Sequence, residues 1–462
     1  MTILTAVVLE VADSTIVNTA LPAIRDGLQA SPAAMQWIIA GYLLALGSLL
    51  LIGGRLGDAF GYSRVFLWGV AGFVAASALC GLAQTPAQLV AARVVQGLAG
   101  AVMAPQTMAL VQILYTPVER IAKLAYFGLI VGLAAIVGPI AGGLLIELDL
   151  FGLGWRLIFL INLPIGLAAI LVGRSVLPGA TGNTALRIDP FGAAIFIGGF
   201  GGLLYGLIGG RGGVWRWSDV VLSAAAAGLI GWGWIRAVAR RRRGLPAIIE
   251  PALFGVASFR WGLIASFFFS AAAIGFLLVF AVSLQQGLGL SPLDTALVHI
   301  PFGAGVMLGI GLLVPRLLPR MGKRLPVAGG IVMVVAVALV LRLIARGDGG
   351  SGWLIGLLAV AGLGMGTLSG PLGPIVVAEV DHANAGTASA TLRTAQQIGG
   401  ALGIAIVGAA YFSVAGDVPL ARLAGLRPAV VTIVVLLLLA TAAAAVLPQD
   451  IFGRSRRPPP QP

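Results

Sequence analysis

The sequence has few polar and few reactive side chains for its length. Its 462 residues include one cysteine, two histidines and 16 acidic residues, and charged residues make up only 10%. Because 59% of the residues are hydrophobic and the mean hydropathy is +1.03, there is too little polar surface to cover a soluble globule of this size. The composition therefore predicts a membrane protein.

The scarcity of these residues also restricts the chemistry. Cys80 has no second cysteine to pair with, which excludes an internal disulfide and a cysteine-ligated metal site. We expect no metal site, no cofactor and no enzyme activity, because no metal-ligand spacing and no nucleophile–base pair stands out. Basic residues outnumber acidic ones by 29 to 16, but in a membrane chain this excess usually reports topology, so no nucleic-acid partner is expected.

A helix needs about 20 apolar residues to cross a bilayer core of about 30 Å. Runs of this length, bounded by charged residues, Gly or Pro, predict an all-α polytopic protein with fourteen crossing helices. The predicted spans are 1–24, 35–56, 64–84, 87–113, 121–146, 156–177, 189–209, 217–238, 259–286, 294–315, 325–345, 353–379, 388–414 and 425–447. The first residues carry no basic leader and no small-residue cleavage site, so we expect no removable signal peptide.

The basic residues are distributed unevenly between the two sides of the predicted bundle. An even number of crossings puts both termini on one side, and twenty of the 29 basic residues fall there, including Arg240–Arg243 and Arg393. Because cytoplasmic loops are rich in Lys and Arg, both termini are predicted to be cytoplasmic. Arg outnumbers Lys by 27 to 2, as in GC-rich bacterial genomes, so the membrane is expected to be a bacterial plasma (inner) membrane.

The two halves of the chain repeat weakly. GGRLGDAFGYSR follows the second span, and VPRLLPRMGKR stands at the matching place after the tenth. The repeat predicts an N-terminal six-helix bundle (1–177), two inserted helices with their connectors (178–257) and a C-terminal six-helix bundle (258–449). Residues 450–462 are polar and Pro-rich and are expected to form a disordered cytoplasmic tail. Parallel repeats of this kind build transporters that rock around a site at the membrane midplane.

Ionisable side chains inside the predicted helices are rare, and each costs about 2.5 to 3.5 kcal/mol on insertion scales. Glu10 and Asp13 share one face of the first helix, with Asn18 further along, and Arg93 and Gln96 share one face of the fourth. One hypothesis is that Asp13 or Glu10 alternately holds a proton and a substrate or counter-cation, while Arg93 tunes the field. The alternative is a static network that ties the first and fourth helices together.

Other polar or flexible positions give weaker signals. The run GPIAGG in the fifth span favours a kink or a close helix contact, because Pro removes a backbone donor and Gly has no side chain. Gln285 ends the ninth span and Gln397 lies in the thirteenth. Each could line a cavity or make a helix contact, and nothing in the sequence decides between these roles.

These motifs resemble those of the major facilitator superfamily, specifically its fourteen-helix drug/proton antiporter branch, over essentially the whole chain. ADSTIVNTALPAI is similar to the branch signature D-x-T-I-V-N-x-A-L-P, whose membrane-embedded acid corresponds to Asp13. Glu10 is not part of that signature. WRLIFLINLPIG at 155–166 and GTASATLRTAQQIGGALG at 386–403 are also close to the family.

Three further motifs of the family have matches here. The resemblance implies a cytoplasmic gate at the G-x-L-x-D-x-x-G loop after the second helix, a proton-coupling motif on the fourth helix and an antiporter motif on the fifth. The matching residues are Gly54, Arg55, Leu56, Asp58, Gly61 and Arg64 in the loop, Arg93, Gln96 and Gly97 on the fourth helix, and Gly138, Pro139, Gly142 and Gly143 on the fifth.

The match to these motifs is incomplete at several positions. Ala59, Tyr62 and Ser63 occupy positions that are usually basic in the gate loop, Ala134 replaces the first glycine of the antiporter motif, and Pro319 replaces the acid in the second copy of the loop.

The resemblance implies a secondary transporter that exports small lipophilic compounds, with cations as one option, by alternating access. Its energy source would be the proton gradient rather than a cofactor, and its partners would be the small-molecule substrate, protons and membrane lipids, with the chain acting as a monomer. A specific metabolite or antibiotic exporter or importer on the same fold is the first alternative, because a fold does not determine its substrate. A membrane receptor or a lipid-acting enzyme is a more distant one.

Overall fold

The computed structural model describes residues 2–179, 189–208, 216–245, 248–348, 351–381, 384–415 and 423–448, although between 117 and 135 not every side chain is described. All regular structure in these ranges is helical. The helices are α1 (Thr2–Leu28), α2 (Pro32–Phe60), α3 (Tyr62–Gly81), α4 (Pro86–Leu114), α5 (Pro117–Leu148), α6 (Leu157–Leu160), α7 (Asn162–Val176), α8 (Pro190–Ile208), α9 (Trp217–Arg242), α10 (Ala257–Val282), α11 (Pro292–Leu308), α12 (Val314–Met321), α13 (Arg324–Ala345), α14 (Gly352–Ser369), α15 (Leu372–Val377), α16 (Ala385–Phe412) and α18 (Leu426–Ala445).

The predicted membrane-crossing helices are confirmed. Among the described residues, 13 helical segments are long and apolar enough to cross a membrane. The remaining predicted span, 121–146, falls within α5, where the described apolar stretch is Gly132–Leu148. Several predicted spans correspond to consecutive helices, for example α6 and α7 together, because short changes of helix type interrupt them.

Local capping signals determine where several helices begin. Ser31, Thr85, Thr116 and Ser291 each precede a proline, and each side-chain oxygen accepts a hydrogen bond from a backbone N–H in the first turn of α2, α4, α5 or α11. The oxygen satisfies a donor that the helix leaves open, and proline fits the first helical position because its missing N–H is not needed there.

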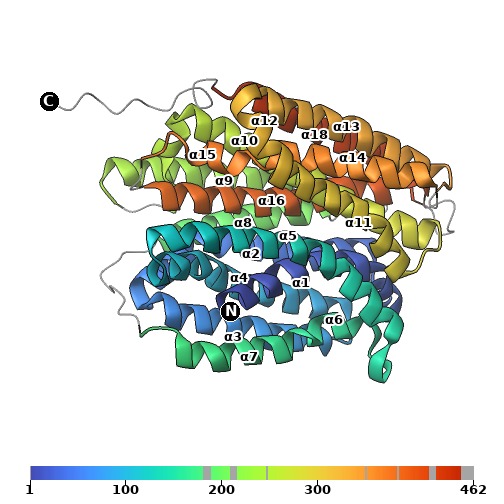
Figure 1. The fold of residues 1–462 in the computed structure, drawn as a ribbon, viewed down its shortest axis with the longest axis horizontal. Coiled ribbons are helices and arrows are strands. Elements are labelled where there is room, and N and C mark those ends of the chain that lie inside the picture. The colour runs from blue at the N-terminus through green and yellow to red at the C-terminus, as the bar shows by residue number, and fades with distance from the viewer. Residues whose placement is uncertain are drawn as a thin grey trace.

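The helices form two groups that lie side by side (Figure 1). The first group contains α1 to α7 and the second contains α10 to α18; α2 packs against α16, and α5 against α11, where the groups meet. Helix α8 packs on α9 and also contacts both α2 and α16. The domain boundaries after residues 177 and 257 stay predictions, and the tail 450–462 lies outside the described residues.

The bundle has two opposite ends, each marked by a turn between consecutive helices. The turn at residues 29–31, between α1 and α2, marks the α1–α2 end, and Gly61, between α2 and α3, marks the opposite α2–α3 end. Helices α1 and α16 both begin at the α2–α3 end, because successive crossings alternate in direction.

Glycines allow the helix backbones to approach closely. A Cβ atom at Gly403 of α16 would lie 2.1 Å from the carbonyl oxygen of Ala271 in α10, and one at Gly53 of α2 would lie 2.0 Å from that of Ala101 in α4. Such contacts replace the hydrophobic driving force that is missing between helices in lipid. Gly399, Gly403 and Gly408 of α16 therefore serve helix packing.

We predict that Gly403→Val destabilises the protein, because the new side chain would push α10 and α16 apart. Overpacking of this kind costs about 1–3 kcal/mol, measurable as a lower thermal unfolding temperature in detergent. Gly356→Val is the control, because a Cβ at this exposed position of α14 meets no atom within 4 Å. Equal losses of stability for the two variants would contradict this account.

Candidate functional site

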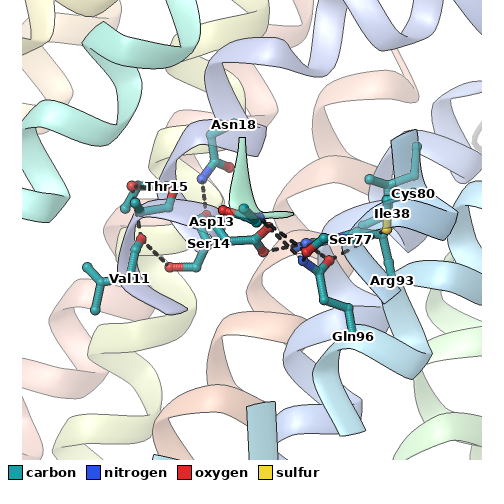
Figure 2. Close-up of polar contacts among 12 residues, drawn as sticks. Val11, Asp13, Ser14, Thr15, Asn18, Ile38, Ser77, Cys80, Arg93 and Gln96 are labelled. Atoms are coloured by element: carbon teal, nitrogen blue, oxygen red, sulfur yellow. Dashed lines mark hydrogen bonds and ion pairs between the residues drawn. The ribbon is translucent and has the colours of Figure 1, made fainter. Parts of the chain in front are cut away.

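A buried polar network surrounds Asp13 at the centre of the first group (Figure 2). The Arg93 Nη1 donates to Asp13 Oδ2 at 2.5 Å, and Gln96 Nε2 donates to Asp13 Oδ1 at 2.8 Å. Asn162 of α7 donates to the same Oδ1 at 3.3 Å, and Ser77 of α3 accepts from both Gln96 and Asn162. We call these five residues the Asp13 network.

The Asp13 network is closed to solvent and lies entirely within one group of helices. The side chain of Asp13 is 0% exposed and that of Arg93 is 1% exposed. Arg93 also donates from Nε to the Ile38 carbonyl at 3.2 Å, and its guanidinium lies over the Tyr42 ring, 4.1 Å from the centroid. The Asp13 carboxylate thus accepts three hydrogen bonds, one of them from the Arg93 cation, which is the pairing that a buried charge requires.

Glu10 is one turn away on α1 but has a different partner. Its Oε1 accepts a 2.6 Å hydrogen bond from Nη2 of Arg393 in α16, so this ion pair joins the first group to the second. The Glu10 side chain is 7% exposed, whereas that of Arg393 is 39% exposed. Both residues lie eight positions into their helices, about 12 Å from the α2–α3 end at 1.5 Å per residue.

Asn18 is a buried polar residue further along α1. Its Nδ2 donates to the Ser14 carbonyl at 3.1 Å, one turn back on the same helix. The Asn18 Oδ1 is buried and has no hydrogen-bond partner among the described residues. Asn18 is therefore outside the Asp13 network.

The glycine and proline motif of α5 forms helix contacts. Cβ atoms at Gly138 and Gly142 would overlap with Thr15 and Ile16 of α1, and Pro139 between them is buried. A Cβ at Gly143 would lie 2.7 Å from Leu293 of α11, in the second group. This motif therefore packs α5 against α1 and also brings the two groups together.

Polar contacts close the interface between the groups at the α1–α2 end. Gln285 Nε2, just after α10, donates to the Thr19 carbonyl of α1 at 2.9 Å. Arg25 Nη1 donates to Gln286 Oε1 at 2.5 Å. Closer to the middle of the interface, Gln397 of α16 packs against Gly47 of α2, where an added Cβ would lie 2.8 Å from the Gln397 Cβ.

At the α2–α3 end the interface is open. A cavity of about 690 Å³ lies between the ends of α2 and α4 in the first group and the start of α16 in the second. Its lining mixes apolar side chains with polar ones, which are Arg55, Asp58, Tyr62, Gln106, Gln112, Asp189, Asn384, Thr387, Ser389 and Arg393. Neither Gln285 nor Gln397 is part of this lining.

The gate motif lies at the mouth of this cavity. Gly54, Arg55 and Asp58 line the cavity, and Asp58 Oδ1 accepts a 2.5 Å hydrogen bond from the Tyr62 hydroxyl. Gly61 ends α2 with φ 90°, a value that favours glycine, and Arg64 is exposed. Tyr62 stands where the family usually has a basic residue, and no ion pair to Asp58 occurs among the described residues.

Asp189 joins the start of α8 to α9 beside the cavity. Its two carboxylate oxygens accept hydrogen bonds from Arg236 of α9 at 2.8 and 3.0 Å, and Oδ1 also accepts from the Gly192 N–H in the first turn of α8. Burial alone would raise the pKa of Asp189, but the hydrogen bonds from Arg236 and Gly192 and the charges of Arg236 and Arg240 lower it below its ordinary value.

Sequence reasoning identified Asp13, Arg93 and Gln96 as neighbours, and the structure brings them together. It missed Ser77, Asn162 and Tyr42, because hydroxyl and amide side chains are common in membrane helices and give no distinctive signal. It also counted Arg393 only as a basic residue of the cytoplasmic side. The position of Arg393 inside the span 388–414 was the available signal, because a charge there needs a partner.

Comparisons with known proteins match this architecture. The sequence model of the Major Facilitator Superfamily matches residues 3–189 and again residues 188–404. The probable actinorhodin transporter of Streptomyces coelicolor is 39% identical over 90% of this chain and 72% of its own length. The multidrug efflux pump LfrA of Mycolicibacterium smegmatis is 32% identical over 91% of this chain and 82% of its own length.

Solved structures show the same fold. A bacterial homologue of the human lysosomal transporter Spinster, in an inward-facing and occupied conformation, has a TM-score of 0.68 at 17% identity, over 96% of this chain and 95% of that one. The peptide transporter POT in complex with sulfate has a TM-score of 0.67 at 18% identity, over 97% and 94% of the two chains. These similarities concern the fold alone.

We predict that Arg93→Gln strongly destabilises the protein, because it leaves the Asp13 carboxylate buried without its cation. Breaking one side of a buried ion pair costs about 3–5 kcal/mol, and adding Asp13→Asn should restore part of the loss in thermal unfolding. The control is Arg241→Gln, which removes a partly exposed ion pair with Glu250 and should cost under about 1 kcal/mol. A double variant no more stable than Arg93→Gln would contradict the coupling.

We also predict that the contribution of Asp189 depends on pH. Because the folded pKa lies below the unfolded one, near 3.8, the stabilisation is complete at neutral pH and disappears as the pH falls through the folded pKa. Thermal unfolding of the wild type and Asp189→Asn should therefore differ most at pH 7 and converge below about pH 4. A stability difference that does not depend on pH would show that the carboxylate charge of Asp189 does not stabilise the contact between α8 and α9.

Proposed function

The chain belongs to the Major Facilitator Superfamily, and from this premise we propose that it exports small lipophilic compounds in exchange for protons. The family makes it a multi-pass membrane transporter rather than an enzyme. The observation that carries the proposal is the one-sided cavity, open at the α2–α3 end and closed by contacts between the groups at the α1–α2 end. A transporter that alternates between two openings needs such an asymmetric state.

The size and the lining of the cavity suit a small molecule. A volume of about 690 Å³ lies within the usual range of about 300–1,000 Å³ for ligand sites. Apolar side chains such as Leu50, Ile52 and Met108 share the lining with the polar groups. Such a mixture supports binding of lipophilic compounds that carry a few polar groups.

We propose that the α2–α3 end faces the cytoplasm of a bacterial inner membrane. This end carries the run Arg240–Arg243 at the end of α9 and both Arg316 and Arg320 of α12, as the positive-inside rule requires. The cavity would then open to the cytoplasm, where an exporter collects its substrate, and both termini would be cytoplasmic. The proposed working unit is one chain surrounded by lipid.

The relatives support antibiotics as the substrate class. Besides the actinorhodin transporter and LfrA, they include the tetracenomycin C resistance and export protein of Streptomyces glaucescens, which is 32% identical over 88% of this chain and 74% of its own length. A second candidate function is export of one dedicated antibiotic rather than many drugs. The name of the actinorhodin transporter, which refers to a single compound, favours this candidate.

We predict that an inside-acid pH gradient drives ethidium, a lipophilic cation, into inverted membrane vesicles that contain the protein. An ionophore that exchanges protons should abolish the accumulation, and Ala390→Trp, which fills the cavity, should lower the initial rate about tenfold, an expected cost of about 1.4 kcal/mol. The control is Val431→Trp, because Val431 lies on an outward face of α18 and is 64% exposed.

Two results would contradict the proposal. Accumulation that persists after the pH gradient has been removed would exclude proton exchange. Equal rates for Ala390→Trp and Val431→Trp would exclude the cavity as the route.

A further inference from the structure

Among the described residues, Glu10 and Arg393 form the one ion pair that joins the two groups. Glu10 belongs to α1 in the first group and Arg393 to α16 in the second, and one hydrogen bond of 2.6 Å joins them. Any rocking of one group against the other changes the distance between these two charges. The ion pair is therefore placed where the conformational change of a transporter acts.

The Asp13 network differs from this pair because it lies within one group of helices and is closed to solvent. All five of its residues belong to α1, α3, α4 and α7, so they move together when the groups rock. Its carboxylate accepts three hydrogen bonds and is 0% exposed. A proton would have to enter a closed site and disrupt several hydrogen bonds.

The Arg393 side of the Glu10–Arg393 pair is open to the cavity. Arg393 lines the cavity that opens at the α2–α3 end, and its side chain is 39% exposed. Only one guanidinium nitrogen, Nη2, donates to Glu10 in the described part of the chain. Because Arg393 is partly solvated and contacts Glu10, water in the cavity lies one side chain away from this nearly buried acid.

We propose that Glu10 and Arg393 form the proton-binding site of this transporter, and that the Asp13 network is a fixed support within the first group. The inference rests on the proposed exchange of drug for protons and assigns it to a particular acid. In the conformation described here Glu10 is ionised and paired with Arg393. In the opposite conformation the groups separate this pair, and Glu10 takes up one proton while Arg393 keeps its charge.

Linkage between proton binding and conformation follows from this arrangement. A buried carboxylate that loses its cation is strongly destabilised, and protonation removes that penalty. The conformation that separates Glu10 from Arg393 therefore binds the proton more tightly, and by reciprocity the proton favours that conformation.

The charges around Glu10 fit this role. On its own helix the neighbouring charge is Asp13, which Arg93 of α4 neutralises at 2.5 Å. From α2 the buried Tyr42 lies within electrostatic reach of Glu10, Asp13, Arg93 and Arg393. Among the described residues, Arg393 is the charged group that acts on Glu10 itself.

The same pair selects the charge of the substrate. When Glu10 is protonated, Arg393 is left as an unmatched positive charge on the cavity wall. That charge opposes a cationic substrate, so the proton and a lipophilic cation exclude each other, as an antiporter requires. An anionic substrate would instead bind together with the proton, which is the arrangement of a symporter. The pair therefore favours lipophilic cations over acids as exported compounds.

The test compares wild type, Glu10→Gln and Asp13→Asn in proteoliposomes, with ethidium as the probe. For Glu10→Gln we expect at least a tenfold loss of accumulation driven by the pH gradient, while exchange of labelled for unlabelled ethidium without a gradient continues. Wild-type affinity for ethidium should fall as the pH is lowered, whereas Glu10→Gln should bind independently of pH. Asp13→Asn should keep the pH dependence of binding even where its stability is reduced.

The outcomes separate this inference from the proposed function. If the wild type fails to accumulate ethidium with the gradient, the proposed exchange itself is wrong. If the wild type accumulates it and Glu10→Gln does so equally well, or if Asp13→Asn alone loses the pH dependence, proton exchange stands and the assignment to Glu10 is overturned. Glu10→Asp, which keeps the acid, should restore pH-dependent binding if Glu10→Gln proves unstable, and its failure to do so in a folded protein would also overturn the assignment.

Discussion

The structure depends on one constraint: a charge inside the membrane must have a partner of opposite charge. Lipid offers no hydrogen bonds, and an unpaired ionised group there costs several kcal/mol. The chain places two acids one turn apart on α1 and satisfies them in different ways. Asp13 receives a cation and two amide donors from its own group of helices, whereas Glu10 receives a cation from the other group. The first arrangement holds α1, α3, α4 and α7 together, and the second links the energy of a charge to the relative position of the two groups.

Close helix packing makes this linkage effective. Glycines bring α10 against α16 and α2 against α4 so closely that no Cβ atom fits between them, and such packing resists deformation within each group. Between the groups, polar contacts are added to glycine packing. At the α1–α2 end they include the hydrogen bonds of Gln285 with Thr19 and of Gln286 with Arg25, together with the packing of Gly143 on Leu293. Rigid groups joined by an interface of modest strength can rock without losing their own hydrogen bonds.

The sequence predicted the fold better than it predicted the site, for physical reasons. Hydrophobic runs determine the number of crossings, because each helix must span the same membrane thickness. The helix starts are also predictable where a capping Ser or Thr precedes a proline, as at Ser31, Thr85 and Ser291. Asp13, Arg93 and Gln96 were predictable because buried charges are rare. The partner of Glu10 could not be predicted, because Arg393 is 383 residues away in the sequence. Their pairing depends on how α1 and α16 face each other across the interface. The pairing of Asp58 was likewise unpredictable, since a tyrosine one turn along occupies the position where a basic residue was expected.

The contacts between the two groups and the proton gradient have free energies of similar size, as a reversible transporter requires. A neutral hydrogen bond contributes about 0.5–1.5 kcal/mol net and one that involves a charged group about 1.5–3 kcal/mol. The bond of Gln285 with the Thr19 carbonyl and that of Arg25 with Gln286 therefore supply together no more than about 4.5 kcal/mol. One pH unit across the membrane is worth about 1.4 kcal/mol per proton, and moving one charge through 100 mV is worth about 2.3 kcal/mol. An interface held by many buried ion pairs would be too stable for a gradient of this size to reverse. Among the described residues one ion pair joins the groups, on the partly solvated side of the interface. In the proposed exchange, so few charge contacts would keep the two conformations close enough in free energy for one proton to decide between them.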